Sequence, residues 1–179
     1  KDEDRAEAKR LLAEAGFPNG FKTKMVGRAG GTPEHQAVVA KEQLSKIGIE
    51  AELEVMELGA LTAVLNRRGH ETTMFNPSHI IDDPDATIGG YYITNGATNY
   101  SSFSDPQTDE LFQKQTSTLD PVERKKVVIQ MQERLLELVP TAIIFWDIYN
   151  MAHWKEVMDY KPGPGSYNGL VLDHVWLAK

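Results

Sequence analysis

Hydrophobic positions along the chain follow two periods, which together predict an α/β fold. Apolar side chains recur at helical spacing over residues 4–15 and 33–47, and strand patterns cover 21–27 and 49–55, the latter with strict alternation. A strand, a helix and a strand in succession predict a β-α-β unit, in which a helix packs across a parallel or mixed sheet.

Three later helices are predicted to begin with the same pair of residues, an aspartate followed by a proline. The pairs are Asp83-Pro84, Asp105-Pro106 and Asp120-Pro121. The carboxylate can accept from free N–H groups of the first turn, and proline fits the first helical position, where its missing N–H costs nothing. Thr32-Pro33 predicts a start of the same kind, and Glu123 predicts a capping box with Asp120.

The rest of the pattern completes one lobe and a tail. A helix is predicted over 61–68, a strand over 71–75, and a second strand over 141–149 that is apolar on both faces and therefore central in the sheet. We expect residues 1–160 to form a mixed sheet flanked by helices. We expect residues 161–179, which combine a Pro/Gly run with a short apolar stretch, to form a tail that packs against something outside this lobe.

Composition narrows the function classes. The chain has 179 residues, 41% of them hydrophobic and 25% charged, as in ordinary globular proteins, and the absence of cysteine excludes thiol catalysis, cysteine-ligated zinc and iron–sulfur clusters. A net charge of −7 argues against nucleic acid and anionic membrane as partners. No apolar run approaches the roughly 20 residues that membrane insertion requires.

Motifs for catalysis and metal binding are missing from the sequence. It contains neither G-x-S-x-G nor H-E-x-x-H, and its five histidines lack helical ligand spacing. The acidic run after His79 does not match an oxygen-ligand loop, which alternates acidic positions with a glycine and a distal glutamate, and Asp83 is explained more simply as a helix cap. We therefore expect no metal, no cofactor and no catalytic site, with a small hydrolase as a remote alternative.

Residues 4–21, DRAEAKRLLAEAGFPNGF, resemble a signature of the peptide/nickel family of ABC-importer solute-binding proteins. Further matches follow in the order of the family at 43–54, 83–85, 99–111 and 175–177. The resemblance implies one lobe of a class II two-lobed receptor, the second lobe, with the signal peptide and first lobe lying outside this chain. It also implies a tail that crosses back to the first lobe, an ABC permease as partner, and a periplasmic or extracellular location.

The loop over residues 75–85 is the informative part of this resemblance. In dipeptide- and oligopeptide-binding relatives, an aspartate four residues before the proline pairs with the amino terminus of the peptide. Ile80 stands at that position here, and Pro77 replaces the aromatic residue three positions earlier. Removing one member of a buried charge pair costs roughly 3–5 kcal/mol, or about two to four decades of affinity, so an ordinary free-amine peptide is not expected unless Asp82 substitutes.

A second candidate region is the polar and aromatic stretch 91–100, whose composition is typical of a pocket wall. The residues that we expect to contact ligand are Phe75, Asn76, Ser78, His79, Ile80, Asn99 and Tyr100. The predicted function is delivery of a small ligand, which is peptide-like, opine- or sugar-like, or a metal chelate, to an import permease. The alternative is a sensory or scaffold lobe that docks a partner protein.

Overall fold

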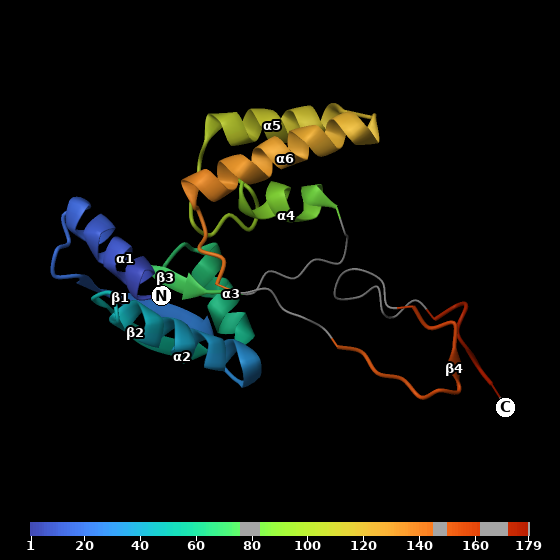
Figure 1. The fold of residues 1–179 in the computed structure, drawn as a ribbon, viewed down its shortest axis with the longest axis horizontal. Coiled ribbons are helices and arrows are strands. Elements are labelled where there is room, and N and C mark those ends of the chain that lie inside the picture. The colour runs from blue at the N-terminus through green and yellow to red at the C-terminus, as the bar shows by residue number, and fades with distance from the viewer. Residues whose placement is uncertain (76–82, 145–149, 162–171, 179) are drawn as a thin grey trace. The chain divides into compact units, whose positions relative to one another are not determined.

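The computed structural model describes residues 1–75, 83–144, 150–161 and 172–178 (Figure 1). The chain divides into two compact units, a first unit that ends at Asn76 and a second unit that begins at Pro77. Among the described helices, none is both long and apolar enough to cross a lipid bilayer.

The first unit is built around a parallel sheet. Its elements are α1 (Asp2–Glu14), β1 (Phe21–Arg28), α2 (Gly31–Ser45), β2 (Ile49–Met56), α3 (Leu58–Asn66) and β3 (Thr72–Met74). The strand order is β2-β1-β3, and both neighbours run parallel to β1, which starts with Phe21 opposite Ile49. The predicted α/β class and β-α-β unit are therefore confirmed.

Helix α2 covers one face of this sheet. Gly27 of β1 faces Ala37 so closely that a Cβ on the glycine would lie 3.4 Å from the Cβ of Ala37. Ala37 and Ala40, which belong to the predicted apolar stripe, are buried. The other face begins with a cross-strand ion pair, Lys22 Nζ to Glu50 at 3.2 Å, between two exposed side chains. The sheet is thus apolar toward α2 and charged at the start of its opposite face.

Two glycines fix the entry into the sheet. Gly20 has a φ of +73° and Gly48 has a φ of +96°, a region that residues with a Cβ rarely adopt. Their backbones touch: the N–H of Phe21 donates to the carbonyl oxygen of Gly48 at 3.2 Å, and a Cβ on Gly20 would overlap that oxygen. The turn before β1 therefore depends on glycine at position 20.

Helix α1 packs less tightly than its apolar pattern predicts. It contains no fully buried residue; Ala8 and Leu12 are half-buried, whereas Leu11 is 51% exposed. The amphipathic pattern therefore identifies the helix correctly but overstates how much of it is covered within the described chain.

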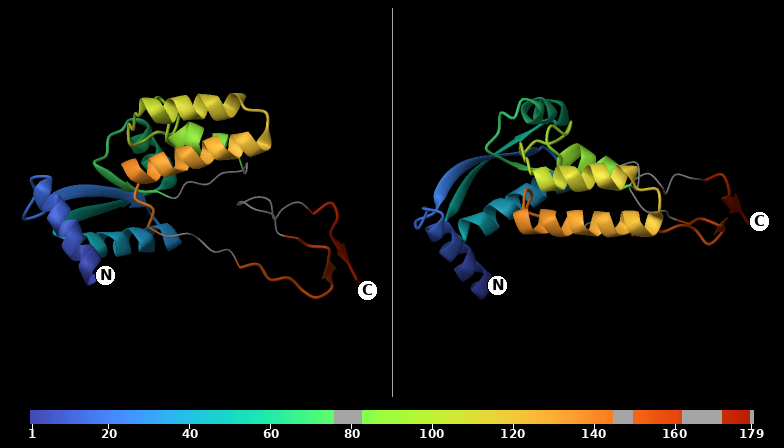
Figure 2. Two further views of the ribbon diagram at one scale, coloured as in Figure 1. Left: turned by 45° about the horizontal axis from the view of Figure 1, so that its top comes forward. Right: turned by 90° about the horizontal axis from the view of Figure 1, so that it is seen from above.

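The second unit contains a helical layer and a short strand pair. Its elements are α4 (Pro84–Tyr91), α5 (Pro106–Ser117), α6 (Pro121–Leu138), β4 (Val157–Met158) and β5 (Trp176–Leu177). Helices α5 and α6 lie side by side (Figure 2). Ile88, Phe112 and Met131, one from each helix, form the core of the layer.

The three Asp-Pro starts are confirmed. Asp83 accepts from the N–H of Asp85, Asp105 from that of Thr108, and Asp120 from those of Val122 and Glu123. The Asp120 half of the capping box is therefore present, while the carboxylate of Glu123 binds Lys126 Nζ at 2.7 Å.

The fourth predicted start, Thr32-Pro33, was wrong in position. Helix α2 begins at Gly31, and its cap residue is Gly30, which has no side chain to cap with. Instead the N–H of Gly30 donates to Glu34 Oε2 at 2.6 Å. The first-turn glutamate thus binds the N–H of the cap residue, as the glutamate of a capping box does, and no side-chain cap of the first-turn N–H groups is present.

The strand predicted over 141–149 is not found where it can be checked. Residues 141–144 have no strand structure, and Ile143 and Ile144 are more than half exposed. Positions 145–149 lie outside the described residues. A strand requires a neighbouring strand to pair its backbone groups, and none within the described chain lies against 141–144.

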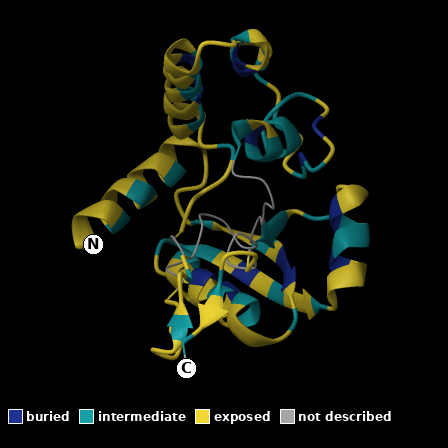
Figure 3. Cartoon of the chain, turned by 90° about the vertical axis from the view of Figure 1, so that its right-hand side faces the viewer, coloured by how far each residue is buried: buried dark blue, intermediate teal, exposed yellow. Residues whose placement is uncertain are grey.

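The end of the chain pairs with the segment before it. Strand β5 runs antiparallel to β4, and Trp176 Nε1 donates to Asp159 Oδ2 at 2.8 Å. Most of this strand pair is exposed (Figure 3), including 71% of Leu177. The separate role predicted for residues 161–179, packing on a first lobe, stays a prediction.

Candidate functional site

Most of the predicted ligand loop lies outside the described residues. This applies to Asn76, Ser78, His79 and Ile80, whose contact with ligand therefore stays a prediction. Phe75 is described: it is half-buried and directly follows β3, at the carboxyl end of a parallel strand. Open α/β sheets bind ligands outside the carboxyl ends of their strands, so Phe75 lies at the expected edge.

Asp83 is the first described residue after the loop, and its carboxylate has partners on two sides. Its carboxylate accepts from the N–H of Asp85 at 2.9 Å and receives a two-pronged ion pair from Arg124 of α6, Nη1 to Oδ2 at 2.9 Å and Nη2 to Oδ1 at 2.8 Å. The Arg124 guanidinium, with the Asp85 N–H second, holds the pKa of Asp83 below its usual value. Asp83 therefore remains a charged helix cap at neutral pH.

A buried amide extends this contact to α5. The side chain of Gln115 is fully buried, its Nε2 donates to Asp85 Oδ1, and its Oε1 accepts from Arg124 Nε at 3.0 Å. Side chains from the start of α4, the last part of α5 and the first turn of α6 thus form one cluster, defined here as the Asp83 cluster (Asp83, Asp85, Gln115 and Arg124). The cluster fixes the start of α4, which directly follows residues 76–82.

Asp105 forms a second cluster of the same kind at the start of α5. It accepts from the N–H and Oγ1 of Thr108 at 2.9 and 2.7 Å, and from Arg134 of α6 through Nε at 3.1 Å and Nη2 at 2.9 Å. Its pKa lies far below the usual range because of Arg134 first, while partial burial acts in the opposite direction. These contacts tie α5 to α6 directly after the loop of residues 93–103.

Asn99 organises that loop from within. It is 2% exposed; its amide donates to the carbonyl oxygens of Ile93 and Phe103 and accepts from Phe103 N–H and Ser101 Oγ, at 2.7–3.2 Å. These four bonds use the full capacity of the side chain. We therefore now propose Asn99 as a residue that positions its neighbours and not as a direct ligand contact.

Tyrosine rings gather beside this loop. The ring of Tyr91 lies edge-on to that of Tyr100, with centroids 6.1 Å apart, and is tilted against that of Tyr92 at 6.3 Å. All three are half-buried, and burial raises the pKa of Tyr91. Ring contacts of this geometry are favourable and stiffen a surface. Tyr100 belongs to this group of rings, and both the predicted pocket wall and its contact with ligand stay predictions.

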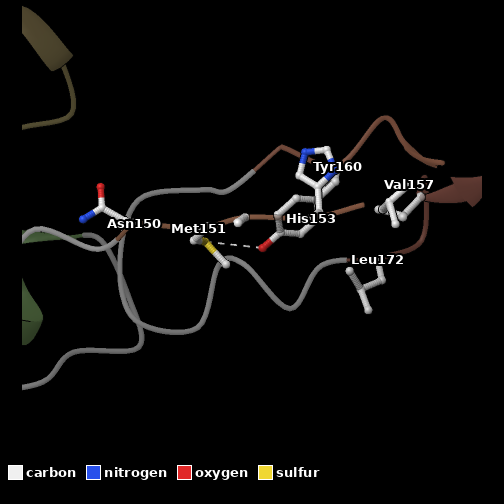
Figure 4. Close-up of a pocket in the computed structure, with 8 residues that line it drawn as sticks. Asn150, Met151, His153, Val157, Tyr160 and Leu172 are labelled. Carbon is white, nitrogen blue, oxygen red and sulfur yellow. Dashed lines mark hydrogen bonds between the residues drawn. The ribbon is translucent and has the colours of Figure 1, made fainter. Parts of the chain in front are cut away.

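A separate hollow of about 480 Å³ lies in the second unit (Figure 4). Its walls are Asn150, Met151, Ala152, His153, Val157, Tyr160, Leu172 and Val175. The polar groups in these walls point to their own neighbours: Tyr160 donates to Met151 Sδ at 3.4 Å, and His153 Nδ1 lies 3.0 Å from the Trp154 carbonyl oxygen. A ligand pocket needs convergent polar groups, so we do not place a solute site here.

Within the described part of the chain, no three His, Cys, Asp or Glu side chains are arranged to hold a metal ion.

The first part of the chain matches a known protein family. The model of the bacterial extracellular solute-binding proteins, family 5, middle region, matches residues 1–100. The chain belongs to this family. Because more than half of the chain is covered, the family resemblance of residues 4–21 is confirmed.

Named relatives in family 5 are much longer than this chain. The glutathione-binding protein GsiB of Escherichia coli K12 is 23% identical over 167 residues, a match that covers 88% of this chain and 33% of the relative. The chain therefore spans about a third of the length of the curated relatives that it matches.

Solved structures agree in fold. The periplasmic binding protein DppA of Helicobacter pylori, in complex with the peptide STSA, has a TM-score of 0.73 and 28% identity over 96% of this chain and 34% of its own. AgaA of Agrobacterium tumefaciens R10, in complex with agropinic acid, has a TM-score of 0.75 and 26% identity over 96% of this chain and 36% of its own. The likeness to these two binding proteins thus extends over nearly the whole chain.

In this family 5 chain, sequence reasoning found the capping aspartates but missed their arginine partners. The patterns described above single out neither Arg124, Arg134 nor Gln115. One signal was available: Thr108 and Gln115 lie four residues before and three residues after buried Phe112, so both are polar residues on the core-facing side of α5. A polar residue on a buried face needs a partner.

Proposed function

We propose that the chain is the second lobe of a two-lobed extracytoplasmic receptor that delivers a small solute to an ABC import permease. Membership of family 5 and the match to about a third of each relative support this proposal. Its partners are the first lobe of the same protein, the permease and the solute, and its location is periplasmic or extracellular. The named relatives are binding proteins, which argues against an enzyme.

Closure of the two lobes would couple solute binding to transport. A solute held between lobes adds contacts that exist only in the closed form, and it therefore shifts the open–closed equilibrium by its difference in affinity for the two forms. The closed form is then the one that the permease recognises. On this proposal, one lobe alone provides only part of the binding energy.

The proposed solute does not depend on a free amino group. The observation that carries this proposal is Ile80, which replaces the carboxylate that pairs with a peptide amine in dipeptide- and oligopeptide-binding relatives. Asp83 is the described acidic residue nearest to Ile80 along the chain. It already accepts two hydrogen bonds from Arg124 and is therefore a poor substitute for the missing carboxylate as a partner of a peptide amine. Peptide-like, opine- or sugar-like and chelate ligands remain compatible, and H. pylori DppA and AgaA are named with a peptide and an opine.

A matched pair of ligands tests this proposal. We expect the complete receptor to bind a short peptide and its N-acetylated form with affinities within about tenfold of each other, because the loss of a buried carboxylate partner removes the preference for a charged amine. Calorimetry with both ligands measures the ratio.

The Ile80→Asp variant is the control, and it should bind the free amine better than the acetylated form. A preference of about a hundredfold or more for the free amine in the unaltered receptor would contradict the proposal, since it would require another carboxylate at the site.

A further inference from the structure

Helix α6 is apolar on two opposite sides. Its inner side carries Val127 and Met131, which are 5% and 0% exposed. Its outer side carries Val122, Ile129 and Leu136, which are 64%, 42% and 68% exposed. A surface helix normally has one apolar stripe, facing the core. The outer stripe therefore needs an explanation of its own.

The outer stripe has a regular spacing. Its three residues are seven positions apart, which is nearly two full helical turns, so they stack in a row about 21 Å long. A row of this kind is the seam along which two helices pair. Within the described chain its members remain exposed, and the inner side is the one that packs on α4 and α5.

The charges beside the stripe have an internal symmetry. At 100° per residue, Lys126 and Glu133 lie on the same flank of the row, one on either side of Ile129 along the helix. Lys125 and Gln132 lie on the other flank. A two-fold axis through Ile129 would reverse one helix relative to the other, placing Val122 opposite Leu136 and Lys126 beside Glu133 twice. A parallel two-fold pairing would instead bring opposite flanks together, placing Lys126 beside Lys125 of the other copy and Glu133 beside Gln132, so the two lysines would repel.

We propose that the outer face of α6 binds the same face of a second copy of the chain, antiparallel and centred on Ile129. The self-complementary order of apolar and charged positions carries this proposal. Neighbouring charges on the same side are already paired within the helix, Glu123 with Lys126 at 2.7 Å and Glu137 with Arg134 at 3.5 Å. Lys126 keeps 63% of its side chain exposed, so it remains accessible to Glu133 of the other copy.

We expect this association to be weak because the interface is small. Three apolar side chains per copy bury less than the roughly 1,000 Å² of a stable interface, so we expect a dissociation constant on the order of 0.1 mM. A receptor of this kind would be monomeric when dilute and paired only where it is concentrated. The proposal concerns a surface, and it holds whichever solute the receptor binds.

Sedimentation of the complete receptor tests this pairing. The unaltered protein should show a concentration-dependent shift toward dimer up to about 1 mM. Glu133→Lys should weaken the association about tenfold, because two attractive pairs become repulsive, and the double variant Lys126→Glu/Glu133→Lys should restore it. Glu110→Lys, an exposed charge reversal on α5, should leave it unchanged.

Three results would overturn the proposal. The first is a monomer at every concentration up to about 1 mM. The second is an unaltered association in Glu133→Lys. The third is failure of the double variant to restore pairing. Because all the substituted side chains are exposed, melting curves should match that of the unaltered protein, which separates loss of pairing from loss of fold.

Discussion

Replacing Gly20 by alanine should destabilise the chain by about 4 kcal/mol. The backbone at Gly20 has a φ of +73°, which costs a residue with a Cβ about 1–2 kcal/mol. The added Cβ would also overlap the carbonyl oxygen of Gly48, a backbone atom that cannot rotate away. The turn would have to move off the start of β2, breaking the hydrogen bond from Phe21 N–H to Gly48. Urea denaturation followed by circular dichroism measures the change.

Gly16→Ala is the matched control for this substitution. Gly16 also has a positive φ, +92°, but a Cβ there would meet nothing within 4 Å. Only the conformational cost of about 1–2 kcal/mol should remain. If both variants lost the same stability, contact between the turn and β2 would not be the reason for glycine at position 20. The difference in stability loss between the two variants would measure why the AGFPNGF segment of the family signature has glycine at position 20.

Asp105→Ala should have the second largest effect, a loss of about 3 kcal/mol. The substitution removes a helix cap and also leaves Arg134, whose side chain is only 27% exposed, without its bidentate partner. Asp120→Ala removes a cap of the same Asp-Pro type, whose carboxylate accepts from the backbone N–H groups of Val122 and Glu123, and should lose about 1 kcal/mol. Denaturation of the two variants under one condition measures the contribution of the arginine.

The effect of Asp105→Ala should depend on pH in a known direction. Because Arg134 lowers the pKa of Asp105 in the folded state, the carboxylate contributes stability above the ordinary aspartate pKa of about 3.8. That contribution is lost as the pH falls through the folded-state pKa. The gap between the unaltered protein and the variant should therefore be full at pH 7 and narrow in strong acid. A gap that widened in acid would contradict the ion pair.

Local rules made much of the fold predictable. The β-α-β unit follows from apolar spacing within about 35 residues, and the three Asp-Pro helix starts follow from capping chemistry within four residues. The start of α2 was misplaced because a glycine cap with a supporting glutamate leaves a weaker sequence signal than Thr32-Pro33. In each case the relevant atoms are close along the chain.

Contacts between distant positions were not predictable in the same way. Arg124 meets Asp83 across 41 positions, and Arg134 meets Asp105 across 29, so neither pair has a spacing that a pattern can reveal. The strand predicted over 141–149 is absent from its described part, 141–144, for a related reason, since apolar residues alone do not supply a pairing partner. In the candidate site, Asn99 was recognised as a polar residue of a pocket wall, but its four bonds inside the loop depend on a backbone path that the sequence does not display.

Calorimetry with the solute that co-purifies with the complete receptor tests the central claim most directly. We predict that the complete, two-lobed protein binds this solute with a dissociation constant on the order of 1 µM, whereas the 179-residue chain alone binds it more weakly than about 1 mM. Micromolar binding by the isolated chain would contradict the account, because one lobe would then be a complete binding module that needs no closure onto a partner lobe.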